Sequence, residues 1–273
     1  GGHSGGAMAA EQVVLKAKQN FEAFAPASES APDLLRSIVD EAHIVIKLTR
    51  FTSEQDPHST AVVFMMQPDR ADWAHCGDSR FYHFRNGKLM TRSADHSLVE
   101  ELVRKGRLDA ESAARHPNRN VLLSCLGSER EPRVDVGHVS PLVGGDAFLL
   151  CSDGLWAYIS EEEMGKILAT HSPRDAASAL IEMARQRARG GGDNISLAVV
   201  KLVEVSPRLR TSPCPCTTGR AASTPGNLAR ASASSNSRGR LLERMPGGPP
   251  AVSVLPGVTA ISRVPNWEKL SSR

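Results

Sequence analysis

The stretch that decides the fold spans residues 61–91 and reads AVVFMMQPDRADWAHCGDSRFYHFRNGKLMT. Four short apolar runs alternate in it with the turn residues Pro68-Asp69, Gly77-Asp78 and Asn86-Gly87. Short runs bounded in this way predict strands, and Asn-Gly between two of them is a strong hairpin signal. We therefore expect an antiparallel meander with strands at 61–66, 71–76, 81–84 and 88–91.

Helical patterns flank this stretch on both sides. Upstream, residues 7–24 and 32–48 place apolar side chains mostly three or four positions apart, which predicts two helices. Downstream, we expect strands at 133–139, 147–151 and 195–200 and helices at 161–170 and 173–189. Because helices and strands do not alternate as β-α-β units, the order favours an α+β fold over a doubly wound parallel sheet.

Charge and composition divide the chain near residue 204. Residues 204–273 carry ten Lys/Arg and three Asp/Glu, which leaves 23 and 27 for residues 1–203, a net charge of −4. This mildly acidic body gives no reason to expect nucleic acid as a partner. The remainder is rich in Ser, Pro and Arg and shows no strand or helix period. We therefore expect one domain over 1–203 and a disordered tail over 204–273.

Cysteine usage and hydropathy predict a cytoplasmic protein without membrane contact. The five cysteines show no metal-site spacing, and three of them lie in or beside apolar runs, where a free thiol packs as a small hydrophobe. No run approaches the ~20 apolar residues of a membrane span, and no signal peptide opens the chain. A reducing compartment fits this usage.

Two carboxylates stand at the ends of expected strands. Asp153 follows the apolar run 147–151 and precedes Gly154, and Asp193 follows a glycine-rich turn just before the run 195–200. Carboxylates are hard oxygen ligands that suit Mg²⁺ or Mn²⁺. Either Asp, considered alone, is more often a turn residue than a ligand. The metal and turn interpretations both stay open on these two residues.

Six sequence blocks in a fixed order favour the metal interpretation. They are GGH at 1–3, HCGDSR at 75–80, ADHS at 94–97 with LVRKG at 102–106, HPNRN at 116–120 with LG at 126–127, CSDGLW at 151–156, and GDN at 192–194. Together they resemble the metal-dependent type 2C (PPM) Ser/Thr protein phosphatases. The short segment between the expected meander and Asp153 is most similar to the bacterial members.

The resemblance implies a β-sandwich of two antiparallel sheets flanked by helix pairs, with two or three Mn²⁺ or Mg²⁺ ions at one edge. Asp153 and Asp193 match family ligands of this centre, and Asp95 matches the ligand of a third, weaker ion. His3 is the candidate general acid for the leaving Ser or Thr oxygen, with an exposed terminal histidine as the alternative. The implied activity is hydrolysis of phosphoserine and phosphothreonine in proteins by a metal-activated water. The expected protein is a monomer that opposes a Ser/Thr kinase.

Other parts of the matching blocks have structural interpretations. Asp78 is interpreted as a turn residue with internal hydrogen bonds rather than a metal ligand, and Arg80 as the partner of a nearby carboxylate. Residues 98–120 resemble the mobile flap of the family. Arg104 and Lys105 there either contact acidic or phosphorylated substrates or lie on a solvated helix face.

The chain departs from the family pattern at its start. That pattern places Asp-Gly-Met directly before Gly-Gly-His, and its Asp bridges both metals, whereas this sequence begins after those residues. The family's first strand and a phosphate-binding Arg also lie upstream. We therefore expect weak metal binding and poor hydrolysis, because the carboxylates that are present repel one another without enough cation charge. We interpret the chain as an N-terminally truncated phosphatase rather than a noncatalytic pseudophosphatase that binds phosphoproteins.

Two other activities are alternatives to protein dephosphorylation. A metal-dependent phosphatase acting on small phosphoesters would use the same carboxylates. Cys214 and Arg220 have the spacing of the phosphate loop in cysteine-dependent phosphatases. Pro215 lacks a backbone N–H that such a loop needs, so we interpret this spacing as a coincidence.

Overall fold

The computed structural model describes residues 5–26, 28–51, 54–189 and 191–202. In chain order its elements are α1 (Gly6–Ala23), α2 (Ala31–Thr49), β1 (Ala61–Met66), β2 (Ala71–Cys76), β3 (Arg80–Arg85), β4 (Lys88–Arg92), α3 (Leu98–Arg104), α4 (Ala110–Arg115), β5 (Asp135–Val139), β6 (Asp146–Cys151), α5 (Asp153–Trp156), α6 (Glu161–Thr170), α7 (Pro173–Ala188) and β7 (Leu197–Lys201). His3 and the expected tail over 204–273 lie outside the described residues. Among the described helices, none has both the length and the apolar character that a bilayer span requires.

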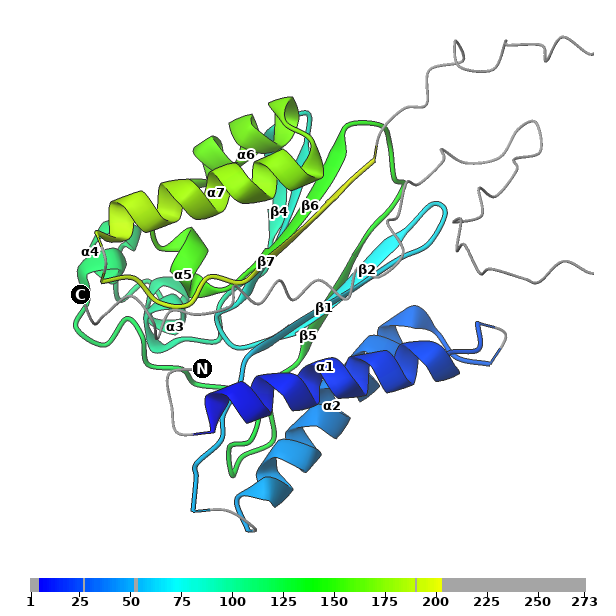
Figure 1. The fold of residues 1–273 in the computed structure, drawn as a ribbon. Helices are drawn as coiled ribbons and strands as arrows, with labels where there is room; N and C mark the ends of the chain where they lie inside the picture. The colour runs from blue at the N-terminus through cyan, green and yellow to red at the C-terminus, as the bar shows by residue number, and fades with distance from the viewer. Residues whose placement is uncertain (1–4, 27, 52–53, 190, 203–273) are drawn as a thin grey trace, which may run out of the picture.

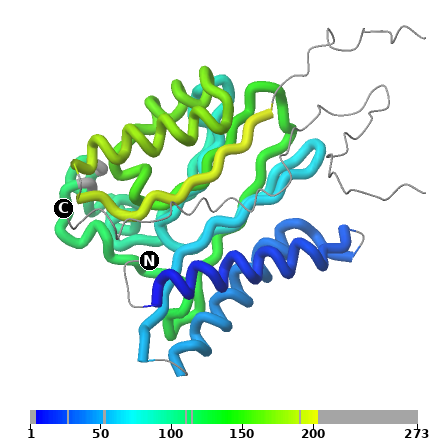
Figure 2. Tube along the Cα trace, in the orientation of Figure 1, coloured from blue at the N-terminus to red at the C-terminus, as the bar shows by residue number. Residues whose placement is uncertain are grey.

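The strands form two antiparallel sheets, which confirms the expected α+β sandwich. One sheet has the order β1-β2-β5 and the other the order β4-β3-β6-β7. Helices α1 and α2 cover the outer face of the first sheet, and α6 and α7 cover the outer face of the second (Figure 1). The tube view shows the same succession of layers (Figure 2).

The expectation of a single meander over 61–91 is wrong, because the chain changes sheets in the middle of this stretch. Strands β1 and β2 pair in the first sheet, and β3 and β4 pair in the second. The crossing occurs at Gly77, whose φ of +106° is a conformation that favours glycine. A Cβ there would lie 2.3 Å from Cγ2 of Thr60. Local turn signals therefore located the strands but did not assign them to sheets.

The Asn86-Gly87 turn between β3 and β4 is confirmed as a tight hairpin. Both residues have positive φ, +49° and +78°, as a type I′ turn requires. At the far end of the sheet, β7 starts at Leu197, two positions later than expected. The delay has a local cause, because the backbone N–H of Ser196 donates to the Ser152 hydroxyl.

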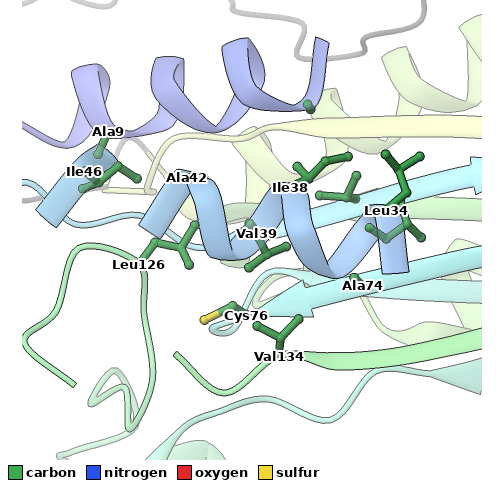
Figure 3. Packing of buried hydrophobic residues seen from close by; sticks show 14 residues of the cluster. Ala9, Leu34, Ile38, Val39, Ala42, Ile46, Ala74, Cys76, Leu126 and Val134 are labelled. Atoms are coloured by element: carbon green, nitrogen blue, oxygen red, sulfur yellow. The ribbon is translucent and has the colours of Figure 1, made fainter. Parts of the chain in front are cut away.

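Three apolar clusters hold the four layers together. Between α2 and the first sheet, one cluster contains Leu34, Ile38 and Ile46 of α2 together with Ala74 and Cys76 of β2 (Figure 3). The clusters between the two sheets and beneath α6 and α7 contain, among others, Trp73, Phe81, Phe148, Met164, Leu168 and Leu180. Burying a large apolar side chain contributes about 1.5–3 kcal/mol. Because the sandwich is packed on both faces of both sheets, its strand ends are held in fixed positions.

Candidate metal centre

Four aspartates gather at one edge of the sandwich. Asp153 follows β6 after one residue, Ser152, and Asp193 precedes β7, while Asp78 precedes β3 and Asp95 follows β4. The antiparallel register brings these strand ends together, since Cys151 of β6 pairs with Arg80 of β3 and with Leu197 of β7. The structure thus places the three predicted ligands, Asp95, Asp153 and Asp193, at the same edge.

Ser152 and Gly154 hold the Asp193 loop against the turn that carries Asp153. The Ser152 hydroxyl donates to the carbonyl of Asn194 at 3.0 Å and accepts from the N–H of Ser196 at 3.0 Å. Gly154 permits the close approach, because a Cβ on it would lie 2.6 Å from the Asn194 carbonyl oxygen. This explains physically why a glycine follows the first carboxylate.

The carboxylates at this edge act on one another electrostatically. Burial raises the pKa of Asp153, and the negative charge of Asp193 raises it further. Burial also raises the pKa of Asp78, to about 6, with the charges of Asp153 and Asp95 adding to the shift. A raised pKa means that the ionised form is disfavoured. A bound cation would therefore reduce the repulsion between these negative charges.

Arg80 and Asp95 form a bidentate ion pair. Nε and Nη2 of Arg80 donate to the two carboxylate oxygens at 2.7 and 2.8 Å, and Nη1 donates to the Tyr82 hydroxyl at 3.1 Å. The predicted pairing of Arg80 with a carboxylate is therefore confirmed. The role of Asp95 as a ligand of a third ion stays a prediction, since both of its oxygens already accept from Arg80.

Asp78 is more closely connected to the centre than its interpretation as a turn residue suggested. It does lie in the turn between β2 and β3, yet its carboxylate is half-buried and coupled to that of Asp153. The sequence contained a signal for this, because an Asp beside a Gly at a strand end occurs both at Gly77-Asp78 and at Asp153-Gly154. Asp78 is therefore a further candidate ligand.

The donor set fits a hard divalent cation in kind, although the described residues do not complete a site. Carboxylate oxygens are the ligands that Mg²⁺ and Mn²⁺ prefer. Within the described part of the chain, no group of three His, Cys, Asp or Glu side chains converges closely enough to hold an ion by itself. Asp153 and Asp193, whose carboxylates are close enough for the charge of one to act on the other, are the main candidate ligands of this centre.

Known proteins with the same sequence pattern and fold are protein phosphatases. The sequence is 34% identical over 206 residues to the serine/threonine phosphatase Stp of Listeria monocytogenes, covering 74% of this chain and 81% of that protein. The chain belongs to the type 2C (PPM) family of protein-serine/threonine phosphatases. No protein-family model matches the sequence.

Solved PPM phosphatases share the fold of this family member. The serine/threonine phosphatase of S. agalactiae superposes with a TM-score of 0.66 at 31% identity, covering 75% of this chain and 84% of that one. The catalytic domain of the phosphatase PstP, solved in complex with two manganese ions, superposes with a TM-score of 0.60 at 26% identity, covering 71% and 80%. The resemblance inferred from the six blocks is therefore confirmed at the level of family and fold.

Replacing Asp78 with Asn is expected to stabilise the metal-free phosphatase at neutral pH. The ordinary pKa is 3.8 and the folded value about 6, so the folded state binds more protons between these values and loses stability as the pH rises through them. At pH 7.5 Asp78→Asn should raise the free energy of unfolding by about 2 kcal/mol, and the gain should vanish near pH 4.

Urea unfolding in EDTA at both pH values measures this difference. Asp69→Asn, at an exposed turn, removes the same charge away from the centre and should change stability little at either pH. Equal effects of the two substitutions at pH 7.5 would contradict the proposed coupling of Asp78 to its neighbours.

Replacing Gly154 with Ala is expected to displace the Asp193 loop of the phosphatase. The added Cβ would overlap the Asn194 carbonyl, so the loop must move and the relative position of the two carboxylates must change. We expect at least a tenfold loss of Mn²⁺-dependent activity from misplacement of about 1 Å. Gly191→Ala is the matched control in the same segment, because its Cβ would meet nothing closer than 3.6 Å. If the two variants have equal activity, the close approach at Gly154 has no functional role.

Proposed function

We propose that this phosphatase hydrolyses phosphoserine and phosphothreonine in proteins with the help of Mn²⁺ or Mg²⁺ held at the aspartate edge of the sandwich. The observation that carries the proposal is that Ser152 holds together the turns of Asp153 and Asp193, so that the charge of Asp193 acts on the Asp153 carboxylate. The solved PstP domain with two manganese ions supports the choice of cation.

Each residue of the centre has a distinct proposed role. Asp153 and Asp193 hold the cation, and Asp78 and Asp95 extend the negative edge on the side of β3 and β4. When bound, the cation would acidify a water molecule and neutralise charge on the phosphoryl group. His3, the proposed general acid, would return a proton to the leaving Ser or Thr oxygen; it lies outside the described residues.

The hypothesis that Arg104 and Lys105 contact the substrate is weakened by ion pairs at the C-terminal end of α3. Glu101 accepts from both Arg104 and Lys105, at 2.7 and 2.9 Å, and these hydrogen bonds lower its pKa to about 2. A substrate carboxylate or phosphate would have to compete with Glu101 for both cations. The alternative of a solvated helix face is therefore favoured for this pair.

The substrate class follows from the family. The oligomeric state, the compartment and the opposing kinase are further proposals. Phosphoproteins are the substrate class of the Ser/Thr protein phosphatases that this chain resembles. We propose that it acts as a monomer in the cytoplasm and removes phosphate that a Ser/Thr kinase has added. Size-exclusion chromatography with light scattering tests the first of these statements.

A comparison of substrates and metals tests the proposed function. Phosphate release is measured from phosphoserine and phosphothreonine peptides, from free phosphorylated metabolites and from p-nitrophenyl phosphate, with Mn²⁺ and with EDTA. The proposal expects Mn²⁺-dependent release that is faster from the peptides than from the metabolites. Faster release from metabolites favours a small-molecule phosphatase, whereas metal-independent peptide binding without turnover favours a pseudophosphatase.

A further inference from the structure

Trp156 joins two carboxylate-bearing turns of the candidate centre. It is the last residue of the short helix α5, which Asp153 begins. Its indole Nε1–H donates a hydrogen bond of 3.0 Å to the backbone carbonyl of Asp78. A direct link therefore runs from the turn that carries Asp153 to the turn that carries Asp78.

The guanidinium of Arg80 lies over the face of the Trp156 indole ring. Cζ of Arg80 lies 3.5 Å from the ring centroid, which is within the range of a cation–π interaction. Arg80 itself has little freedom, because two of its nitrogens are bonded to Asp95. Trp156 is thus held both at its N–H and at its ring face.

Charge repulsion acts against this link. Asp78 and Asp153 are half-buried carboxylates whose negative charges raise the free energy of the pair when both are ionised. Without a bound divalent ion, this repulsion tends to move the two turns apart. The hydrogen bond from Trp156 to the Asp78 carbonyl and the Arg80 guanidinium stacked on the indole oppose that movement.

We propose that Trp156 is a positioning residue that holds the Asp78 turn at a fixed separation from Asp153, so that the carboxylates are set in advance for a divalent cation. The inference rests on the proposed function, because it assumes a metal role for these carboxylates. It assigns to Trp156 a task that acts through Asp78 and Asp153 rather than contact with the substrate.

Trp73 shows what an indole with a purely packing role looks like in the same domain. It is buried between the sheets, 9% exposed, and stacks on Phe81 with ring centroids 5.1 Å apart. Its Nε1 has no hydrogen-bond partner among the described residues. Trp156, in contrast, is half-buried, and its indole N–H donates a hydrogen bond to the backbone carbonyl of Asp78.

The test compares Trp156→Phe with Trp73→Phe in the 273-residue chain. Each removes an indole N–H and retains an aromatic ring, but only the first variant loses a hydrogen bond to a carboxylate turn. Hydrogen–deuterium exchange of the 77–80 backbone amides is measured without metal, and Mn²⁺ affinity is measured from the electron paramagnetic resonance signal of the free ion. Thermal unfolding gives the stability of both variants.

We expect Trp156→Phe to speed exchange at 77–80 and to weaken Mn²⁺ binding, each by about fivefold to tenfold, as the loss of one hydrogen bond predicts. Trp73→Phe should lower the melting temperature and change neither quantity by more than about twofold. The proposal is overturned if exchange at 77–80 is unchanged in Trp156→Phe, or if both variants weaken Mn²⁺ binding equally.

Failure of the positioning role can be told apart from failure of the proposed function. If neither the 273-residue chain nor a version with Asp-Gly-Met added before Gly1 binds Mn²⁺ or releases phosphate, the proposed function is wrong. Exchange in the metal-free chain then decides the inference alone: faster exchange at 77–80 in Trp156→Phe supports it, and unchanged exchange overturns it. If the wild type binds Mn²⁺ and Trp156→Phe binds it equally well, Trp156 is only a packing residue.

Discussion

Adding Asp-Gly-Met directly before Gly1 is expected to raise the Mn²⁺-dependent hydrolysis of p-nitrophenyl phosphate by about 100-fold or more. The first ten residues of the sequence contain no carboxylate, and the described edge offers only the coupled pair Asp153 and Asp193 with Asp78 and Asp95 nearby. A further carboxylate at this edge would help to hold the cations and should add several kcal/mol of binding and transition-state charge stabilisation. A factor of 100 corresponds to about 2.7 kcal/mol.

The matched control for this extension is Asn-Gly-Met before Gly1. It adds the same length and the same amide and methionine groups without the negative charge. Only the Asp version should gain activity and Mn²⁺ affinity. Equal rates for the 273-residue chain and the Asp version would show that the residues already present suffice for catalysis. Equal gains from the Asn and Asp versions would assign the effect to chain length rather than to the carboxylate.

Local patterns in the sequence were enough to locate most helices and strands. The turn residues at Pro68 and Asn86 mark real breaks, and the expected helix at 161–170 agrees residue for residue with α6. These signals work because they depend on backbone conformation within a few residues. The division of 61–91 between two sheets depends instead on contacts with β5 and β6, far along the chain. No local pattern encodes such contacts.

The candidate centre was predictable in part for the same reason. Asp153 and Asp193 stand out because each lies beside a glycine at a strand end, and their order among the six blocks indicated a shared site. The coupling of Asp78 to Asp153 was not predictable, because it depends on burial and distance across the sandwich edge. The contact of Trp156 with Asp78 is likewise a tertiary one.

Replacing Asp193 with Asn in the protein that carries Asp-Gly-Met before Gly1 is expected to reduce Mn²⁺-dependent hydrolysis by about 100-fold or more. The reason is the loss of one metal-binding charge. The loop itself should keep its conformation. Asp193 Oδ1 accepts a hydrogen bond of 2.7 Å from the Asn194 N–H, and the Oδ1 of an asparagine can accept the same bond. The substitution therefore removes charge with little change in shape.

Two measurements separate loss of a ligand from loss of structure. Without metal, Asp193→Asn should be as stable as the parent protein or more stable, because its negative charge no longer raises the pKa of Asp153. With Mn²⁺, the parent should gain more stability than the variant, since a ligand that binds only the folded state stabilises it in proportion to its affinity. Glu162→Gln, on the exposed surface of α6, removes one charge elsewhere and should leave activity unchanged. Retained activity in Asp193→Asn would overturn the assignment of Asp193 as a metal ligand, and a large loss of stability in EDTA would assign it a structural role.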